Sequence, residues 1–310
     1  MYYPFLRGKL YELLSLRELS DTGDLGFIVP IIEPVQDNYS ALNKATEKLG
    51  ENGNRHIFVY KPNVGDLTNR EGFRTLIENI FRDENQVPGF ILDGKNDNLV
   101  LPVIEELEPD EIAIIHYEKT QLLDEITAIV DRENIVNILH LDRLGPFIHR
   151  QFPGFNNVIL RDPFTTERRN ADYEEVDNQS LSDDHLFFSK EGYFGYSDYL
   201  VIGEEFTAGG FAPYAVAIHL SYLKEDNSCW VKHFVSDNNE DQTNVAGKYM
   251  EAMDKLIDWA DENAELITPT SAYEEFRELH AEEHYPGLGY LKKLSIKHHI
   301  EMINNFLSPS

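Results

Sequence analysis

Short apolar runs alternate with amphipathic stretches of helical period from residue 27 to about residue 162. Six such runs are rich in β-branched and aromatic residues, namely 27–33, 56–61, 89–93, 111–116, 135–142 and 157–162. Their apolar positions are nearly continuous, which is typical of parallel strands that helices cover on both faces. The spacing leaves room for one helix between successive runs, so the pattern predicts repeated βα units.

After Pro163 this rhythm changes. Residues 165–192 are polar and predict an exposed excursion, and two further strand-like runs follow at 199–203 and 214–222. The run at 228–235 is spaced to form a hairpin with 214–222, and the rest of the chain is helical. Eight candidate parallel strands favour a (β/α) barrel, TIM-barrel-like, over a doubly wound sheet, which stays open as the alternative.

We therefore expect an α/β barrel-like domain over residues 1–237, including the excursion at 165–192. Residues 238–310 are expected to form C-terminal helices that pack on the same domain. No Gly-x-Gly-x-x-Gly follows any of the runs, so the sequence lends no support to a dinucleotide fold.

Charge and cysteine content narrow the class of protein. The chain of 310 residues has a formal net charge of −28 and no basic run, so direct binding to nucleic acid is not expected. No apolar stretch is long enough to span a membrane, and no signal peptide follows Met1, so we expect a cytoplasmic protein without membrane contact. The single Cys229 excludes an internal disulfide.

Ionisable residues fall at the ends of the predicted strands. The set comprises Glu33, Lys61, Asp93, His116, Asp142, Arg161 and Asp162, and His219 lies within the run at 214–222. In a barrel the carboxyl ends of the strands meet at one mouth, where these side chains would surround a shared cavity. The plainer alternative is that each charge marks the point where a buried strand reaches water.

These residue types suit metal-assisted phosphoester hydrolysis of an anionic small molecule or nucleotide. Glu33, Asp93 and Asp162 offer the oxygen ligands that Mg²⁺ prefers, and Lys61 and Arg161 can pair with a phosphate. The candidate catalytic residues are Lys61, Asp93, His116, Asp142 and Arg161, with His116 as general acid or base. The candidate ligand-binding residues are Arg7, Lys9, Gly209, Gly210 and His219. No single motif among them is diagnostic.

The N-terminal segment has a distinctive sequence. Tyr3-Pro-Phe-Leu-Arg-Gly-Lys9 precedes Glu12, and Ile28-Val-Pro-Ile-Ile-Glu-Pro34 follows it. These segments, with 217–222 and 233–237, resemble the beta-protein family of phages and bacteria. The resemblance implies a role in phage–host conflict, that is, antiviral defence, with a small nuclease-like protein as partner. It marks Arg7, Lys9, Glu12 and Glu33 as family-type positions without assigned roles.

Two other functions fit the composition. A non-catalytic subunit could control a nuclease-like partner through its acidic helices or the excursion at 165–192. An acidic DNA mimic would instead present carboxylates spaced like phosphates to a DNA-binding protein.

Overall fold

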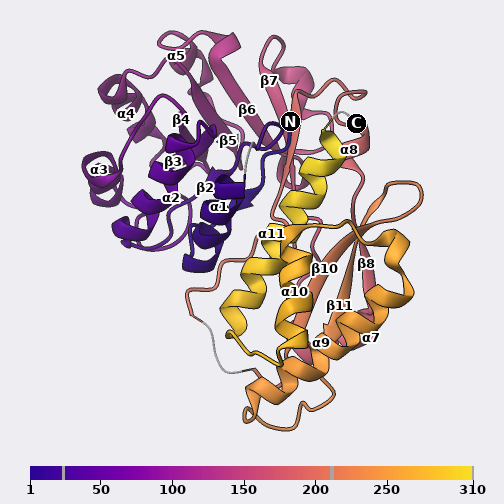
Figure 1. The fold of residues 1–310 in the computed structure, drawn as a ribbon. Coiled ribbons are helices and arrows are strands. Elements are labelled where there is room, and N and C mark those ends of the chain that lie inside the picture. The colour runs from indigo at the N-terminus through magenta and orange to yellow at the C-terminus, as the bar shows by residue number, and fades with distance from the viewer. Residues whose placement is uncertain (23–24, 210–212, 309–310) are drawn as a thin grey trace. The chain divides into compact units, whose positions relative to one another are not determined.

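A computed structural model describes residues 1–22, 25–209 and 213–308. The chain divides into two compact units (Figure 1). The first contains Met1–Asp162 and Phe187–Tyr199, and the second contains Pro163–Leu186 and Leu200–Ser310. These bounds differ from the expected boundary at residue 237, because the second unit includes the hairpin and residues 165–186 of the excursion, whereas 187–192 belong to the first unit.

The first unit is a nearly closed barrel of eight parallel strands in the order β1-β2-β3-β4-β5-β6-β7-β9. The strands are β1 (Phe5–Leu6), β2 (Ile31–Ile32), β3 (His56–Lys61), β4 (Gln86–Leu92), β5 (Ile112–His116), β6 (Ile135–His140), β7 (Asn156–Arg161) and β9 (Gly195–Asp198). A parallel bridge between Tyr2 and Tyr196 joins the two edges, and the Tyr3 N–H donates to the Tyr196 carbonyl at 2.8 Å. The predicted TIM-barrel-like class is confirmed.

Helices separate the strands and run along the outer side of the sheet (Figure 1). They are α1 (Leu10–Thr22), α2 (Tyr39–Glu51), α3 (Arg70–Asn79), α4 (Val100–Leu107), α5 (Leu123–Thr127) and α6 (Leu141–Leu144), with short 3₁₀ turns at Asp97–Leu99, Arg132–Asn134 and Ile148–Gln151. Asn38 and Asn69 cap α2 and α3, because each side-chain oxygen accepts from a backbone N–H of the first turn.

The barrel interior is filled by alternate residues of the strands. Ile31, Val59, Ile91, Ile115 and Leu160 belong to one buried apolar cluster, together with aromatic rings from both ends of the unit. Successive strand residues point to opposite faces of a sheet, so every second residue faces this interior and the others face the helices. This alternation fixes which strand-end side chains reach the mouth.

Two of the eight predicted barrel strands are corrected. The run at 199–203 is a turn, with Leu200 at a φ of 54°, and the strand lies just before it as β9. The run at 214–222 is β10 (Ala217–Leu223), which pairs in antiparallel fashion outside the barrel. The remaining barrel strand is β1, whose two residues are too few to show a period in the sequence.

The second unit has a three-stranded antiparallel sheet in the order β10-β11-β8. The predicted hairpin of β10 with β11 (Cys229–Val235) is confirmed, and the excursion supplies β8 (Asn178–Ser182). The helices of this unit are α7 (Tyr173–Val176), α8 (Asp184–Phe187), α9 (Val245–Glu262), α10 (Ser271–Ala281) and α11 (Leu288–Leu307), with 3₁₀ turns at Asn170–Asp172 and Ala264–Leu266. Ile218, Leu220 and Phe234 share one core with α9, α10 and α11, so these helices cover one face of the sheet (Figure 1).

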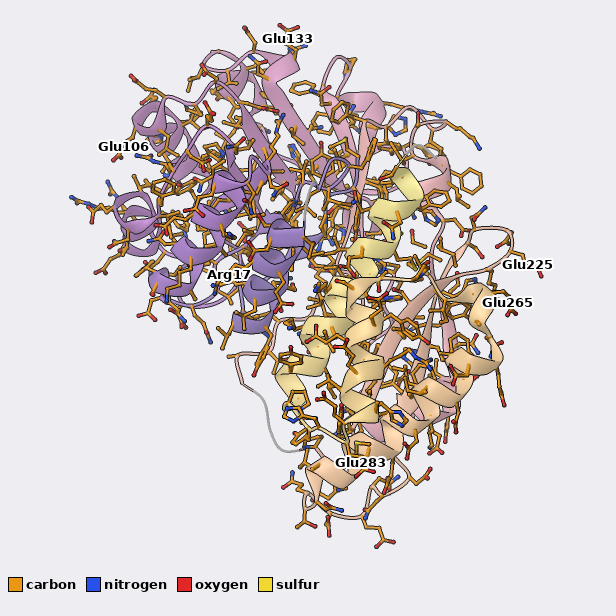
Figure 2. All side chains as sticks on the ribbon, viewed as in Figure 1. Arg17, Glu106, Glu133, Glu225, Glu265 and Glu283 are labelled. Carbon is orange, nitrogen blue, oxygen red and sulfur yellow. The ribbon has the colours of Figure 1, made fainter. Side chains whose placement is uncertain are left out.

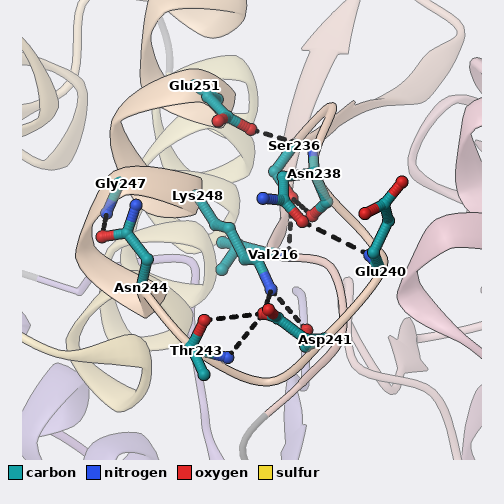
Figure 3. Close-up of polar contacts among 10 residues, drawn as sticks. All are labelled: Val216, Ser236, Asn238, Glu240, Asp241, Thr243, Asn244, Gly247, Lys248 and Glu251. Carbon is teal, nitrogen blue, oxygen red and sulfur yellow. Dashed lines mark hydrogen bonds and ion pairs between the residues drawn. The ribbon is translucent and has the colours of Figure 1, made fainter.

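The acidic segment between β11 and α9 is folded back on itself by local hydrogen bonds (Figure 3). Lys248 is fully buried, and its Nζ donates to the Asp241 carbonyl at 2.5 Å. The Thr243 N–H and hydroxyl both donate to the Asp241 carboxylate at 2.8 Å. The Val216 N–H donates to the Ser236 hydroxyl at 3.0 Å, which ties this segment to the start of β10.

Much of the negative charge lies at the surface. Figure 2 shows side chains that point outward in both units, among them the exposed Glu106, Glu133, Glu225, Glu265 and Glu283. Such carboxylates stay hydrated, as expected of solvated helix and loop faces. Within the described parts of the chain, no helix combines the length and apolarity needed to cross a membrane.

Candidate functional site

Seven polar side chains lie at the carboxyl ends of the barrel strands, at positions that alternation turns inward. We name this set the mouth cluster: Arg7, Glu33, Lys61, Asp93, Tyr117, His140 and Tyr199. In TIM-barrel enzymes the active site occupies this end of the barrel. Each strand from β1 to β6 contributes one member, and Tyr199 directly follows β9.

Arg7 and Glu33 form a buried ion pair, with Arg7 only 4% exposed and Glu33 fully buried. The other Glu33 oxygen, Oε1, accepts from the backbone N–H groups of Asn63 at 2.7 Å and Val64 at 3.2 Å. Burial opposes the charge of Arg7, but Glu33 and the nearby Tyr117 and Tyr199 outweigh it and raise the pKa of Arg7 above its ordinary value. The guanidinium is thus held charged and in place.

The turn after β1 depends on a glycine. Gly8 has a φ of +61°, and a Cβ there would lie 3.0 Å from the Glu33 carbonyl oxygen. The Arg7 N–H donates to Glu12 Oε2 at 2.6 Å, so the first turn of α1 also fixes this segment. Arg7, Glu12 and Glu33 therefore lie together.

Lys61 is engaged by three acceptors. Its Nζ donates to the Ile91 carbonyl at 2.6 Å and to Asp93 Oδ1 at 2.8 Å. The same Nζ lies 3.0 Å from Asp97 Oδ1. An ammonium has three N–H donors, so these contacts can use all of them. We assign Lys61 a positioning role that holds Asp93 and Asp97, in place of direct contact with a ligand.

The aromatic half of the mouth cluster contains a pair of tyrosine hydroxyls, and each tyrosine ring packs against a guanidinium. The Tyr117 and Tyr199 hydroxyl oxygens are 2.5 Å apart. Arg7 Cζ lies 5.1 Å from the centre of the Tyr199 ring, and Arg143 Cζ lies 4.8 Å from that of Tyr117. The His140 ring meets Tyr117 edge-on at 5.2 Å and lies 6.2 Å from Tyr199. Two hydroxyl groups and an imidazole are therefore concentrated at one place, next to the Arg7–Glu33 ion pair and the Arg143 guanidinium.

The predicted place of His116 in the mouth is corrected. Ile115 and Tyr117 belong to the barrel interior, so His116 between them faces the outer layer. Its Nε2 lies 2.6 Å from Asn137 Oδ1, and its ring packs 5.1 Å from that of Phe152. Burial lowers the pKa of His116 to about 4, although the bond to Asn137 opposes this. The histidine is a neutral core residue near pH 7.

Arg161 is corrected for the same reason. Val158 and Leu160 face the interior, so Arg161, the last residue of β7, is turned to the outer side. Asp142 is exposed in α6, beyond the end of β6, and its Oδ2 accepts from the Asp162 N–H at 3.0 Å. Neither Arg161 nor Asp142 joins the mouth cluster.

The predicted Mg²⁺ ligands do not fit a metal ion. Glu33 is neutralised by Arg7 and Asp93 by Lys61, and Asp162 is the one predicted ligand that alternation from Leu160 turns inward at the end of β7 without either of these pairings. Among the described residues, no three histidine, cysteine or carboxylate side chains come together as a metal site. A cation would have to displace buried positive charges from Glu33 and Asp93, so we derive no step through a metal.

The other predicted ligand-binding residues are dispersed. Lys9 immediately precedes α1 and is partly buried. Gly209 is exposed in a loop of the second unit, with nothing within 4 Å of where a Cβ would lie, and Gly210 lies outside the described residues. His219 is on β10 in the second unit, where it pairs with His233 as the hairpin predicted.

Sequence reasoning missed Tyr117, His140 and Tyr199. The predicted runs ended one residue before Tyr117 and two residues after His140, because charged residues were taken as the strand ends. Counting alternate residues from Ala113 or Val136 would have assigned Tyr117 and His140 to the interior face. Tyr199 had no such signal, since it directly follows a strand that was placed too late.

The fold and the mouth cluster define a TIM-barrel-like protein with a polar site at the carboxyl ends of its strands. No protein-family model matches the chain, and no curated protein matches it either.

Proposed function

We propose that the protein binds a small anionic, phosphate-bearing ligand at the mouth cluster and hydrolyses its phosphoester bond. One observation carries the proposal: the Tyr117 and Tyr199 hydroxyls are 2.5 Å apart, and each of the two rings packs against a guanidinium, that of Arg143 at Tyr117 and that of Arg7 at Tyr199. Glu33 and Asp93 offset the charges of Arg7 and Lys61, so the groups offered to an oxyanion are the hydroxyl donors and the Arg143 guanidinium.

The ligand's oxyanion would lie against the two hydroxyls, near both guanidiniums. Preorganised donors and fixed positive charge stabilise negative charge that develops in a transition state, and they act most strongly in a buried site. Glu33 keeps Arg7 oriented, and Lys61 keeps Asp93 and Asp97 oriented. These pairs supply the rigid frame of the site.

His140 is the candidate acid–base group because it is the imidazole beside the hydroxyl pair. Water oxygen would bond to phosphorus while the ester P–O bond breaks. The leaving oxygen would take a proton from His140, and the imidazole would regain the proton that the water releases. The products would be an alcohol and inorganic phosphate.

Titration with inorganic phosphate, followed by calorimetry, tests the binding step. Tyr199→Phe removes one hydroxyl of the pair and should weaken binding by about tenfold. Tyr60→Phe is the matched control, since Tyr60 is buried in the same barrel with its hydroxyl on Gln86 and should bind as the native chain does. Equal affinity in both variants, or no binding below about 10 mM, would contradict the proposal.

Hydrolysis of p-nitrophenyl phosphate tests the chemical step. His140→Gln should lower kcat by about 100-fold while the affinity for inorganic phosphate changes little, because the imidazole acts on the proton. A parallel loss of affinity and turnover would instead assign His140 to binding.

The role in phage–host conflict rests on the family resemblance alone. The alternatives of a nuclease-controlling subunit and a DNA mimic stay predictions as well. Co-purification with a neighbouring gene product tests the first, and salt-dependent capture of a DNA-binding protein tests the second.

A further inference from the structure

The second unit contains a cavity of about 300 Å³ along the free edge of β10. Consecutive residues Val216–His219 line it from both faces of this edge strand, and Val201 and Ile202 line another side. Leu288, Leu291, Lys292 and Ser295 reach it from successive turns of α11. Its volume suits a small ring-sized molecule.

Aromatic rings from the excursion close one wall of this cavity. Phe164 and Tyr173 both line it, and their ring centres lie 5.3 Å and 4.7 Å from that of His219. The His233 ring centre lies 4.6 Å from that of Tyr173, at a tilt, and 4.9 Å from that of His219, which it meets edge-on. The mixture of apolar walls and a few polar groups is typical of ligand sites.

A chain of hydrogen bonds from Thr165 through Gln179 and His233 determines which nitrogen of His219 carries the proton. The Thr165 N–H can only donate, so the Gln179 atom 3.2 Å from it is Oε1. Gln179 Nε2 therefore donates, to the Thr165 carbonyl at 3.4 Å and to His233 Nε2 at 3.1 Å. A nitrogen that accepts carries no proton, so the proton of neutral His233 is on Nδ1.

The same donor–acceptor argument applies to the ring of His219. His233 Nδ1 lies 2.8 Å from His219 Nδ1 and donates to it, so neutral His219 carries its proton on Nε2. Burial, then His233 and Lys292, lower the pKa of His219 to about 3, and burial lowers that of His233 to about 4. Both rings are therefore neutral near pH 7, which the chain of hydrogen bonds requires.

His219 thus presents a fixed N–H donor on the side away from His233. Lys292, which lines the same cavity, adds positive charge close to it. A carboxylate can accept from His219 Nε2–H and lie near the Lys292 charge, in a cavity that Glu167 also lines, and the aliphatic side chains around these groups suit an apolar body.

We propose that this cavity binds a small organic acid, with its carboxylate on His219 Nε2 and near Lys292, and its apolar body against Phe164 and Ile218. The site lies wholly within the second unit and does not depend on the function proposed for the barrel. The relay from Gln179 through His233 acts as a positioning device that fixes the donor.

Benzoate is the probe for this site, with benzyl alcohol as the probe of the same shape that lacks the charge. We expect the full chain to bind benzoate at least about tenfold more tightly than benzyl alcohol, as calorimetry measures it. Lys292→Met and His219→Phe should each weaken benzoate binding about tenfold or more. His284→Phe is the control, because His284 is exposed outside the cavity and should leave the affinity unchanged.

Nitrogen-15 NMR of the native chain tests the site without a variant, in case His219→Phe does not fold. The tautomer predicts a proton on His219 Nε2, and benzoate should shift that signal while leaving His284 unchanged. The proposal is overturned if the proton is found on His219 Nδ1, if benzyl alcohol binds as tightly as benzoate, or if the variants retain native affinity.

Discussion

Glu33 shows how much one carboxylate can determine at the residue scale. It holds Arg7 through one oxygen and accepts two backbone N–H groups through the other, and the Arg7 and Glu33 side chains are both buried. A buried charge is tolerated only when it is paired in this way. The Arg7–Glu33 pair therefore orients a guanidinium for the proposed ligand and also keeps the turn after β1 in place.

Glu33→Gln should lower the free energy of unfolding by about 3 kcal/mol, because it leaves the Arg7 charge buried without a counter-charge. Urea unfolding measures the change. The matched control is Glu78→Gln, which breaks the exposed Arg74–Glu78 pair and should have no measurable effect. If the two variants unfold at the same urea concentration, the Arg7–Glu33 pair does not stabilise the barrel as argued.

At the element scale, the connection from β1 to α1 sets the first part of the mouth. Gly8 makes this connection at a φ of +61°, with the Glu33 carbonyl close to where a Cβ would lie. Gly53 has a similar φ of +68°, but nothing lies within 4 Å of where its Cβ would be. Comparing substitutions at Gly8 and Gly53 therefore distinguishes the cost of backbone strain from the cost of a steric contact.

Gly53→Ala should cost about 1 kcal/mol, which is the backbone cost of a left-handed conformation for a residue with a Cβ. Gly8→Ala should cost more, because its Cβ would also press on the Glu33 carbonyl. Thermal unfolding of the two variants measures the difference. A smaller loss of stability in Gly8→Ala than in Gly53→Ala would contradict this, because it would show that the β1–α1 connection accommodates a Cβ without strain.

The alternating pattern predicted the barrel class and the strands β2 to β7, because each is a buried run followed by room for a helix. It did not predict β1, whose two residues show no period, nor the third strand β8, which lies within a polar excursion. Glu33, Lys61, Asp93, His116 and Arg161 were all placed in the mouth because they end their predicted runs. Alternation turns the first three inward and the other two outward. A shift of one residue in a strand reverses the face, and this distinction needed coordinates.

At the scale of the whole molecule, five histidines have pKa values well below the ordinary value for the side chain. The pKa is lowered mainly by burial to about 4 for His116, His233 and His298, and to about 3 for His219 and His299. In the unfolded chain these groups titrate near 6.5. Below that pH the unfolded chain binds more protons than the folded one, so stability rises with pH in this window.

The free energy of unfolding should therefore fall as pH is lowered from about 6.5 to about 4, by about 1.4 kcal/mol per pH unit for each such histidine. Above about pH 7 these groups are neutral in both states and contribute no slope. Urea unfolding at a series of pH values measures this. His298→Gln should reduce the slope of unfolding free energy against pH by the contribution of one histidine. His284→Gln, at an exposed position, should leave that slope unchanged. A flat profile below pH 6.5 would show that these rings are charged in the folded state.

The most direct test of the barrel-mouth proposal is a crystal structure of the full chain grown with tungstate, an oxyanion that is located by its anomalous scattering. We predict a peak within hydrogen-bonding distance of the Tyr117 and Tyr199 hydroxyls, between Arg7 and Arg143, and no such peak in Tyr199→Phe. Tungstate bound only elsewhere, with the mouth cluster unoccupied in the native chain, would contradict the proposed site.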